Sequence, residues 1–221
     1  MLFRSVFGGG SYSSNSLGTT EVGSVTIRVE GGEVKNNIFA CGQGANSKVY
    51  GSVDVTFAGS NDYSCNVYGY GVQESATVTN DRTLSFATYT GTLSGDIGGF
   101  DAIAFAGDTA ATLSGSSIDN DDWSFDYTGR TLDAATAMLT LDSGSFAGDN
   151  VSVDLSDVEQ VSTGWSVAAG LAAADATYNV ELSTGSAANL ALGDTLGAAY
   201  GVYAGWGFAL EDSTLKFKQL A

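Results

Sequence analysis

Apolar and polar residues alternate in short runs along most of this chain. In the run from Val25 to Val29, three apolar side chains alternate with Thr26 and Arg28. Similar runs occur at residues 53–57, 123–127, 151–155, 178–182 and 215–218. Because successive side chains of a strand point to opposite faces, each run predicts a strand with one apolar and one polar side. Clusters of Gly, Ser, Asn and Asp between the runs predict turns, so the predicted fold class is all-β.

The first third of the chain contains a repeat. The segment Asn-Ile-Phe-Ala-Cys-Gly at residues 37–42 recurs as Asn-Val-Tyr-Gly-Tyr-Gly at 66–71 and as Ser-Val-Phe-Gly-Gly-Gly at 5–10. Two further runs that match each other begin at Gly23 and Gly51. A repeat of this length, with two or three short strands, must stack on its neighbours to bury its apolar face, which predicts a β-helical solenoid. An ordinary β-sandwich is the alternative.

The repeat divides the chain into two parts. We expect a parallel β-helix over residues 1–115 and a β-rich, non-repetitive continuation or cap over residues 116–221, because the repeat is lost after Gly115. Ile38 and Val67 share one repeat position and are predicted to stack on each other, pointing inward. Residues 167–176 are rich in Ala, which is a strong helix former, and predict either a short helix or an Ala-rich loop or buried strand.

Aromatic residues recur with the repeat. Phe7, Phe39 and Tyr68 occupy one repeat position, and we predict that they belong to the core, because an aromatic ladder running from coil to coil is more often packing than a binding surface. Tyr70 and Tyr203 are the aromatic residues predicted to be exposed and to contact a ligand such as a sugar ring.

These motifs are similar to the repeat array of autotransporter-like passenger proteins of Gram-negative bacteria. The resemblance rests on the Asn-Val-Tyr-Gly-x-Gly units, on Gly-Gly-Phe-Asp at residues 98–101 and on Trp-Ser-Phe-Asp-Tyr at residues 123–127. It implies a right-handed parallel β-helix, an adhesin or passenger segment, and an extracellular location on the bacterial cell surface. It implies no particular ligand or chemistry.

The charge balance excludes several classes of partner. The chain has 221 residues, with 25 acidic and 8 basic residues, a formal net charge of −17 and no His. Such a charge repels phosphate backbones and anionic membrane surfaces, so we expect neither nucleic acid nor an anionic membrane as a partner. No apolar run approaches the length of a membrane-spanning helix, and no membrane span is expected. Without His, neither a Ser-His-Asp triad nor a His-based zinc site can form.

One acidic turn is a candidate metal site. Asp119, Asp121 and Asp122 place three carboxylates within four positions. Calcium takes six to eight oxygen ligands, so such a turn could hold it, although the spacing of an EF-hand loop is absent. The alternative is a solvated acidic turn. No other cofactor is expected.

The two cysteines leave two interpretations open. Cys41 and Cys65 are separated by a little less than one repeat, so they could bridge neighbouring coils, as suits an exported protein. In the repeat alignment they are about five residues out of register, which favours two free, partly buried thiols, since a disulfide needs its Cα atoms within about 7 Å.

Two classes of function compete. The first is a non-catalytic surface-exposed or secreted module that contacts host or matrix glycans or proteins. The second is a β-helical polysaccharide lyase or glycoside hydrolase. A hydrolase would need two carboxylates on neighbouring coils, for example Asp54 and a partner, and a lyase would need Arg82 or Arg130 as its base. The spacing selects neither set, so we predict no catalytic residues and no enzyme.

Overall fold

The computed structural model describes most of the N-terminal two thirds of the chain and separate strands beyond it. The described residues are 2–9, 20–42, 47–72, 77–120, 122–128, 137–144, 150–154, 160–161, 166–171, 179–183, 191–192, 195–196, 206–211 and 214–219. All regular elements among these residues are β-strands, which confirms the predicted all-β class.

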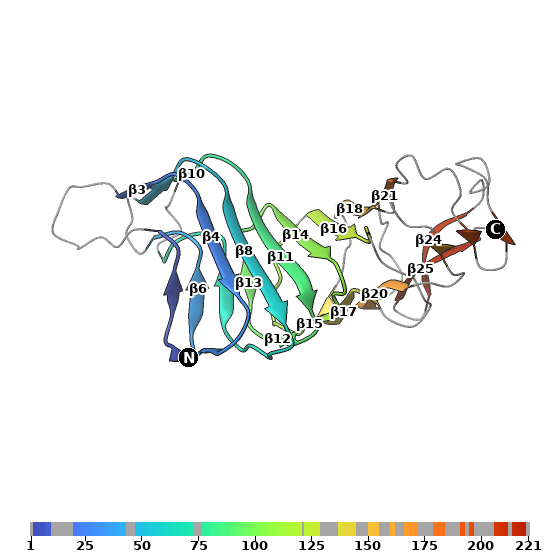
Figure 1. The fold of residues 1–221 in the computed structure, drawn as a ribbon, viewed down its shortest axis with the longest axis horizontal. Helices are drawn as coiled ribbons and strands as arrows, with labels where there is room; N and C mark the ends of the chain where they lie inside the picture. Colours follow the sequence, from blue (N-terminus) through green and yellow to red (C-terminus); the bar gives the residue numbers. More distant parts are fainter. Residues whose placement is uncertain are drawn as a thin grey trace.

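The largest sheet has seven parallel strands in the order β4–β8–β11–β14–β16–β18–β21 (Figure 1). Its strands are β4 (Val25–Val29), β8 (Val53–Gly59), β11 (Arg82–Tyr89), β14 (Ala102–Ala106), β16 (Asp122–Asp126), β18 (Asn150–Asp154) and β21 (Asn179–Ser183). Each strand pairs with the equivalent strand of the next coil, as in a solenoid. The predicted parallel β-helix is therefore confirmed.

A second parallel sheet forms another wall of the same coils. Its order is β2–β6–β9–β13, and its strands are β2 (Val6–Phe7), β6 (Asn37–Phe39), β9 (Asn66–Tyr68) and β13 (Ile97–Gly98). The third wall starts at β12 (Thr92–Leu93) and continues through β15 (Ala111–Leu113), β17 (Leu139–Gly144) and β20 (Ser166–Leu171). Between these walls lie the chain turns, and inside them lies the core.

Smaller sheets complete the described structure. In the first coils, β1 (Leu2–Phe3) pairs with β5 (Glu33–Val34), and β7 (Ser47–Val49) lies between β3 (Thr20–Val22) and β10 (Thr77–Val78). Towards the C-terminus, the third wall gains β25 (Thr214–Gln219) and β24 (Trp206–Glu211), while β19 (Gln160–Val161), β22 (Ala191–Leu192) and β23 (Thr195–Leu196) form a separate sheet.

Parallel pairing continues across the boundary expected after Gly115. β14 pairs in parallel with β16, and β16 with β18, so the seven-stranded sheet crosses this boundary without a break. Antiparallel pairs among the described strands are β20–β25, β24–β25 and β22–β23. The division into domains at residues 115 and 116 stays a prediction. The change from parallel to antiparallel strand pairing lies further along the chain, at β20 and β25. Of the Ala-rich stretch 167–176, the described part up to Leu171 is strand β20 rather than a helix.

The two coil steps that follow β11 are shorter than the steps before and after them. Val55 pairs with Leu84, and Leu84 pairs with Ile103, so the second step along the chain is much shorter than the first. The next step, from Ile103 to its partner Trp123, is again short. The small sheet β3–β7–β10 ends at the same point, so the longer first coils carry an extra corner that the shorter coils lack.

The core is built from columns of apolar side chains, one from each coil. Ile38 pairs with Val67, and both are fully buried, which confirms the predicted inward stack. A column of phenylalanine rings in the seven-stranded sheet is also fully or almost fully buried, with ring centroids 5.7, 5.2 and 5.0 Å apart. This inner aromatic ladder consists of Phe57, Phe86, Phe105 and Phe125.

The prediction that Phe7, Phe39 and Tyr68 belong to the core is wrong. Phe7 is 41% exposed, and Phe39 and Tyr68 are half-buried on the outer face of the sheet β2–β6–β9–β13. The physical reason is the alternation of side chains along a strand. Because Ile38 and Val67 take the inward positions, the residues that follow them must point outward.

Candidate functional site

Four aromatic rings form a continuous stack on the outside of the solenoid, which we call the outer aromatic stack. It consists of Phe7, Phe39, Tyr68 and Tyr70. The ring centroids of Phe7 and Phe39 are 5.7 Å apart, those of Phe39 and Tyr68 5.3 Å, and those of Tyr68 and Tyr70 5.0 Å. The planes of successive rings lie within 27° of parallel. The stack arises because strands β2, β6 and β9 are in register.

The stacking decides which parts of the rings can meet a ligand. Rings that cover one another's faces along the solenoid axis leave their edges towards solvent, together with the phenol hydroxyl edge of the tyrosines. Tyr70, predicted from the sequence as an exposed ligand contact, is half-buried at the end of this stack. Tyr203, the other predicted contact, lies outside the described residues.

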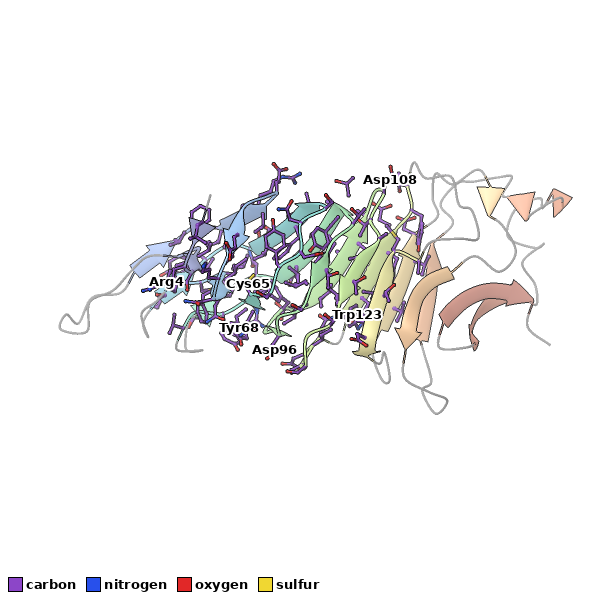
Figure 2. The ribbon with its side chains drawn as sticks, turned by 90° about the horizontal axis from the view of Figure 1, so that it is seen from below. Arg4, Cys65, Tyr68, Asp96, Asp108 and Trp123 are labelled. Carbon is purple, nitrogen blue, oxygen red and sulfur yellow. The ribbon has the colours of Figure 1, made fainter. Side chains whose placement is uncertain are left out.

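A polar row runs beside the outer aromatic stack on the same sheet. Asn37 is in register with Asn66, and the Asp96 backbone N–H donates to Oδ1 of Asn66 at 2.9 Å. The Ser116 hydroxyl donates to Asp96, and this bond together with the N–H of Ser117 lowers the pKa of the Asp96 carboxyl. Figure 2 shows Tyr68 and Asp96 along the same side of the ribbon, with Asp108 on the opposite side. Aromatic edges and polar groups therefore form one outer surface.

Glycine ends the aromatic row. Gly98 is in register with Tyr68, so the row continues with no side chain at that position. The next residue, Gly99, has a φ of +71°, and a Cβ atom there would overlap the ring of Tyr70. Only glycine accommodates both this backbone conformation and the close approach of the ring.

Beyond the end of the stack lies a hollow of about 360 Å³, which we call the acidic hollow. It is lined by Arg82, Gly99, Phe100, Asp101, Asp119, Asn120 and Asp122. These residues come from three successive coils, and the register of the solenoid brings them together.

An ion pair forms one side of the acidic hollow. The Arg82 guanidinium donates to both carboxylate oxygens of Asp101, at 2.7 and 3.1 Å, and the Arg82 backbone N–H donates to the same carboxylate at 2.8 Å. The hydrogen bonds from Arg82 lower the pKa of Asp101, and the bond to Asp101 raises the pKa of Arg82. The charges of these two residues balance each other.

Asn120 forms another side of the hollow. Its side-chain amide Nδ2 donates to the backbone carbonyl of Asp122 at 2.6 Å. This bond fixes the orientation of the amide, because the reverse orientation would place two acceptor oxygens against each other. Asn120 is only 9% exposed, and its Oδ1 is buried with no hydrogen-bond partner among the described residues.

The structure thus brings two of the three predicted calcium ligands, Asp119 and Asp122, to the acidic hollow. Asp121 lies outside the described residues, and so does Arg130. Among the residues that the structure describes, no three His, Cys, Asp or Glu side chains gather as a metal-binding group. Asn120, which sequence reasoning did not single out, lies between the two acids and contributes an amide oxygen instead.

The carboxylate named for a hydrolase, Asp54, has no carboxylate partner in register with it. Its register neighbours on the adjacent strands are Thr26 and Thr83. Asp126, however, is in register with Asp154 on the next coil. Sequence reasoning missed this pair, although both acids end the same apolar-Ser-apolar-Asp pattern.

Both cysteines are free and fully buried. The Cys41 thiol donates to the carbonyl of Gly69 at 3.4 Å. Burial raises the pKa of Cys41 and of Cys65 to about 11. Of the two interpretations of the cysteines, the structure has the free thiols.

Family models, curated proteins and solved structures were each compared with the chain, and none of the three comparisons gave a match. Within the described part of the chain, no helix has the length and hydrophobicity needed to cross a membrane.

Proposed function

We propose that this chain is a non-catalytic β-solenoid module of a bacterial surface-exposed or secreted protein, such as an adhesin or passenger segment, and that its outer face contacts glycans. The observation that carries the proposal is the outer aromatic stack beside the polar row. Both run along the solenoid axis on the same sheet, over the coils that contain β6 and β9.

The chemistry of this surface suits sugars. The exposed ring edges offer apolar contact area, and the tyrosine hydroxyls, the Asn37 amide and the Nδ2 of Asn66 can form hydrogen bonds with sugar hydroxyls. Neighbouring coils lie about 4.8 Å apart, so an extended polymer along the axis meets an Asn and an aromatic residue on each of the two coils that contain β6 and β9. The formal charge of −17 favours a neutral or cationic glycan over an anionic one.

Glycan binding by the purified chain tests the proposal. Neutral, cationic and anionic polysaccharides would be compared with variants Tyr68→Ala and Tyr70→Ala, and we expect roughly tenfold weaker binding when one ring is removed. Tyr50→Ala is the matched control, because Tyr50 is 52% exposed but lies at the corner formed by β3, β7 and β10. Binding to no glycan in the panel, or equal binding by all variants, would contradict the proposal.

A glycoside hydrolase is the second candidate, favoured by the Asp126–Asp154 pair. Retaining glycosidases hold two carboxyl groups about 5 Å apart, close to the spacing of neighbouring strands. Release of reducing ends that is lost in Asp126→Asn would establish this activity and replace the module proposal. A lyase is disfavoured, because an arginine base must lose its proton and the bond to Asp101 raises the pKa of Arg82.

A further inference from the structure

We propose that the acidic hollow binds a calcium ion, with the buried Oδ1 of Asn120 and the carboxylates of Asp119 and Asp122 as protein ligands. This inference is independent of glycan binding. Its starting point is Asn120, not the acidic character of the turn.

Asn120 has an oxygen that needs a partner. Leaving a buried acceptor unsatisfied costs about 1–3 kcal/mol, and such atoms in folded proteins commonly mark an ion or an ordered water. The Nδ2 atom of this amide is already held by the carbonyl of Asp122, so Oδ1 cannot turn away to find another donor. Asn120 lines the hollow together with Asp119 and Asp122, so its unsatisfied oxygen belongs to the same turn as two acids.

The surrounding groups favour a cation over a water molecule. The amide oxygen and the carboxylates are all acceptors, and a water has only two hydrogens to donate, whereas a cation can be shared by three or more oxygens. Arg82 is the basic residue that lines the hollow, and its charge is balanced by Asp101. Asp119 and Asp122 add two further carboxylates to the lining.

The donor set indicates which cation. All the proposed ligands are oxygen atoms, which suits hard cations such as calcium and magnesium. Calcium accepts six to eight oxygens in irregular geometry and tolerates water among them, whereas magnesium demands a near-ideal octahedron. A hollow of about 360 Å³ with ligands on one turn has room for water to complete a calcium shell.

Terbium luminescence gives a direct test, because Trp123 follows Asp122 in the chain and its ring is buried against Phe105, with centroids 6.3 Å apart. Terbium replaces calcium at oxygen sites, and tryptophan excitation would sensitise its emission. We expect saturable emission that calcium displaces with a midpoint of about 10⁻⁴–10⁻³ M, the range of extracellular calcium modules, and that magnesium displaces only at higher concentration.

Variants separate this site from general binding to an acidic surface. Asn120→Ala and Asp122→Asn should each weaken calcium binding, measured by calorimetry, by about tenfold or more. Asn120→Asp keeps the oxygen and adds charge, so it should bind at least as tightly as the parent chain, although it loses the Nδ2 bond. Asp108→Asn is the control, since it makes the same charge change at an exposed position between β14 and β15.

Asp119→Asn tests the site with little risk of disturbing the fold, because Asp119 is exposed. It should weaken calcium binding while the circular dichroism spectrum stays that of the parent chain. Absence of calcium binding at millimolar concentration, or equal loss of affinity in Asp108→Asn and the site variants, would overturn the proposal. If the hollow held only water, no calcium binding would be measured.

Discussion

Phe86 stacks on Phe105 inside the solenoid, with ring centroids 5.2 Å apart and planes only 12° from parallel. The step along the chain from Phe86 to Phe105 is ten positions shorter than the step from Phe57 to Phe86, which also stack. The chain thus shortens its coil without losing the register of the inner aromatic ladder. The extra residues of the long coils are accommodated at the corner that carries β3, β7 and β10, where Val49 extends the core.

The inner and outer aromatic residues should differ in their effect on stability. Phe105→Ala removes a fully buried ring and should lower the free energy of unfolding by about 3–5 kcal/mol. Phe39→Ala removes a half-buried outer ring and should cost about 1 kcal/mol, the scale of an aromatic pair. Denaturant unfolding of both variants measures the difference. Equal losses would contradict the assignment of the two columns to the inside and the outside.

Close contact between coils makes Gly95 sensitive to any side chain. A Cβ atom at Gly95 would overlap the backbone carbonyl of Cys65 on the preceding coil. Gly95→Ala must therefore separate two hydrogen-bonded coils, and we expect a loss of about 2–3 kcal/mol, as for overpacked cores. The melting temperature and the denaturant midpoint would both report the loss.

Gly23→Ala is the matched control for Gly95→Ala. A Cβ atom at Gly23 would meet no atom within 4 Å, and this residue has no positive φ. The control should be within about 0.5 kcal/mol of the parent chain. If the two variants unfolded together, the coils would not be as closely spaced as this structure has them.

The Arg82–Asp101 pair should make stability depend on pH in the acid range. Its hydrogen bonds lower the pKa of Asp101 in the folded chain, so the pair stabilises the fold above the unfolded value of about 3.9 and this contribution disappears as the pH falls through the lower folded value. Asp101→Asn should therefore cost about 1 kcal/mol or less at pH 7, because the pair is partly exposed, and progressively less as the pH falls through the folded pKa of Asp101.

Glu30→Gln serves as the control for this pH dependence. Glu30 pairs with Arg28, but both side chains are more than half exposed, so its removal should change stability little at any pH. Urea unfolding at several pH values, with both variants beside the parent chain, gives the comparison. A constant difference between Asp101→Asn and the parent from pH 7 to pH 2 would show that the carboxylate charge is not responsible.

The period-two pattern was sufficient to predict the strands and the inward stack of Ile38 on Val67. The same alternation places Phe39 and Tyr68, the residues that follow Ile38 and Val67, on the outer face. They were predicted to be core because aromatic residues recur at this repeat position, but the alternation of side chains along a strand is the stronger rule. The true inner ladder has its own signal, an apolar residue two positions before Phe57, Phe86, Phe105 and Phe125. The spacing of these four phenylalanines is uneven, which conceals them from a search for one repeat length.

The acidic hollow could be predicted only in part. The acids at 119 and 122 are visible as a cluster, but Arg82 and Asp101 come from two earlier coils, and only the register between β11 and β14 places them beside the turn. The unsatisfied oxygen of Asn120 depends on burial and on a 2.6 Å bond to a backbone carbonyl, neither of which a sequence contains.

The two cysteines should be protected from thiol reagents in the folded chain. Cys41 and Cys65 are fully buried and free, and burial raises both pKa values to about 11. Because the thiolate is the reactive form, both residues should react very slowly with a thiol reagent at pH 8 in the folded chain and should give two thiols per chain on unfolding without reductant. Ser60→Cys, at an exposed position, supplies a third thiol that should react at once. A mass two hydrogens lower, with no thiols released on unfolding, would instead establish the disulfide.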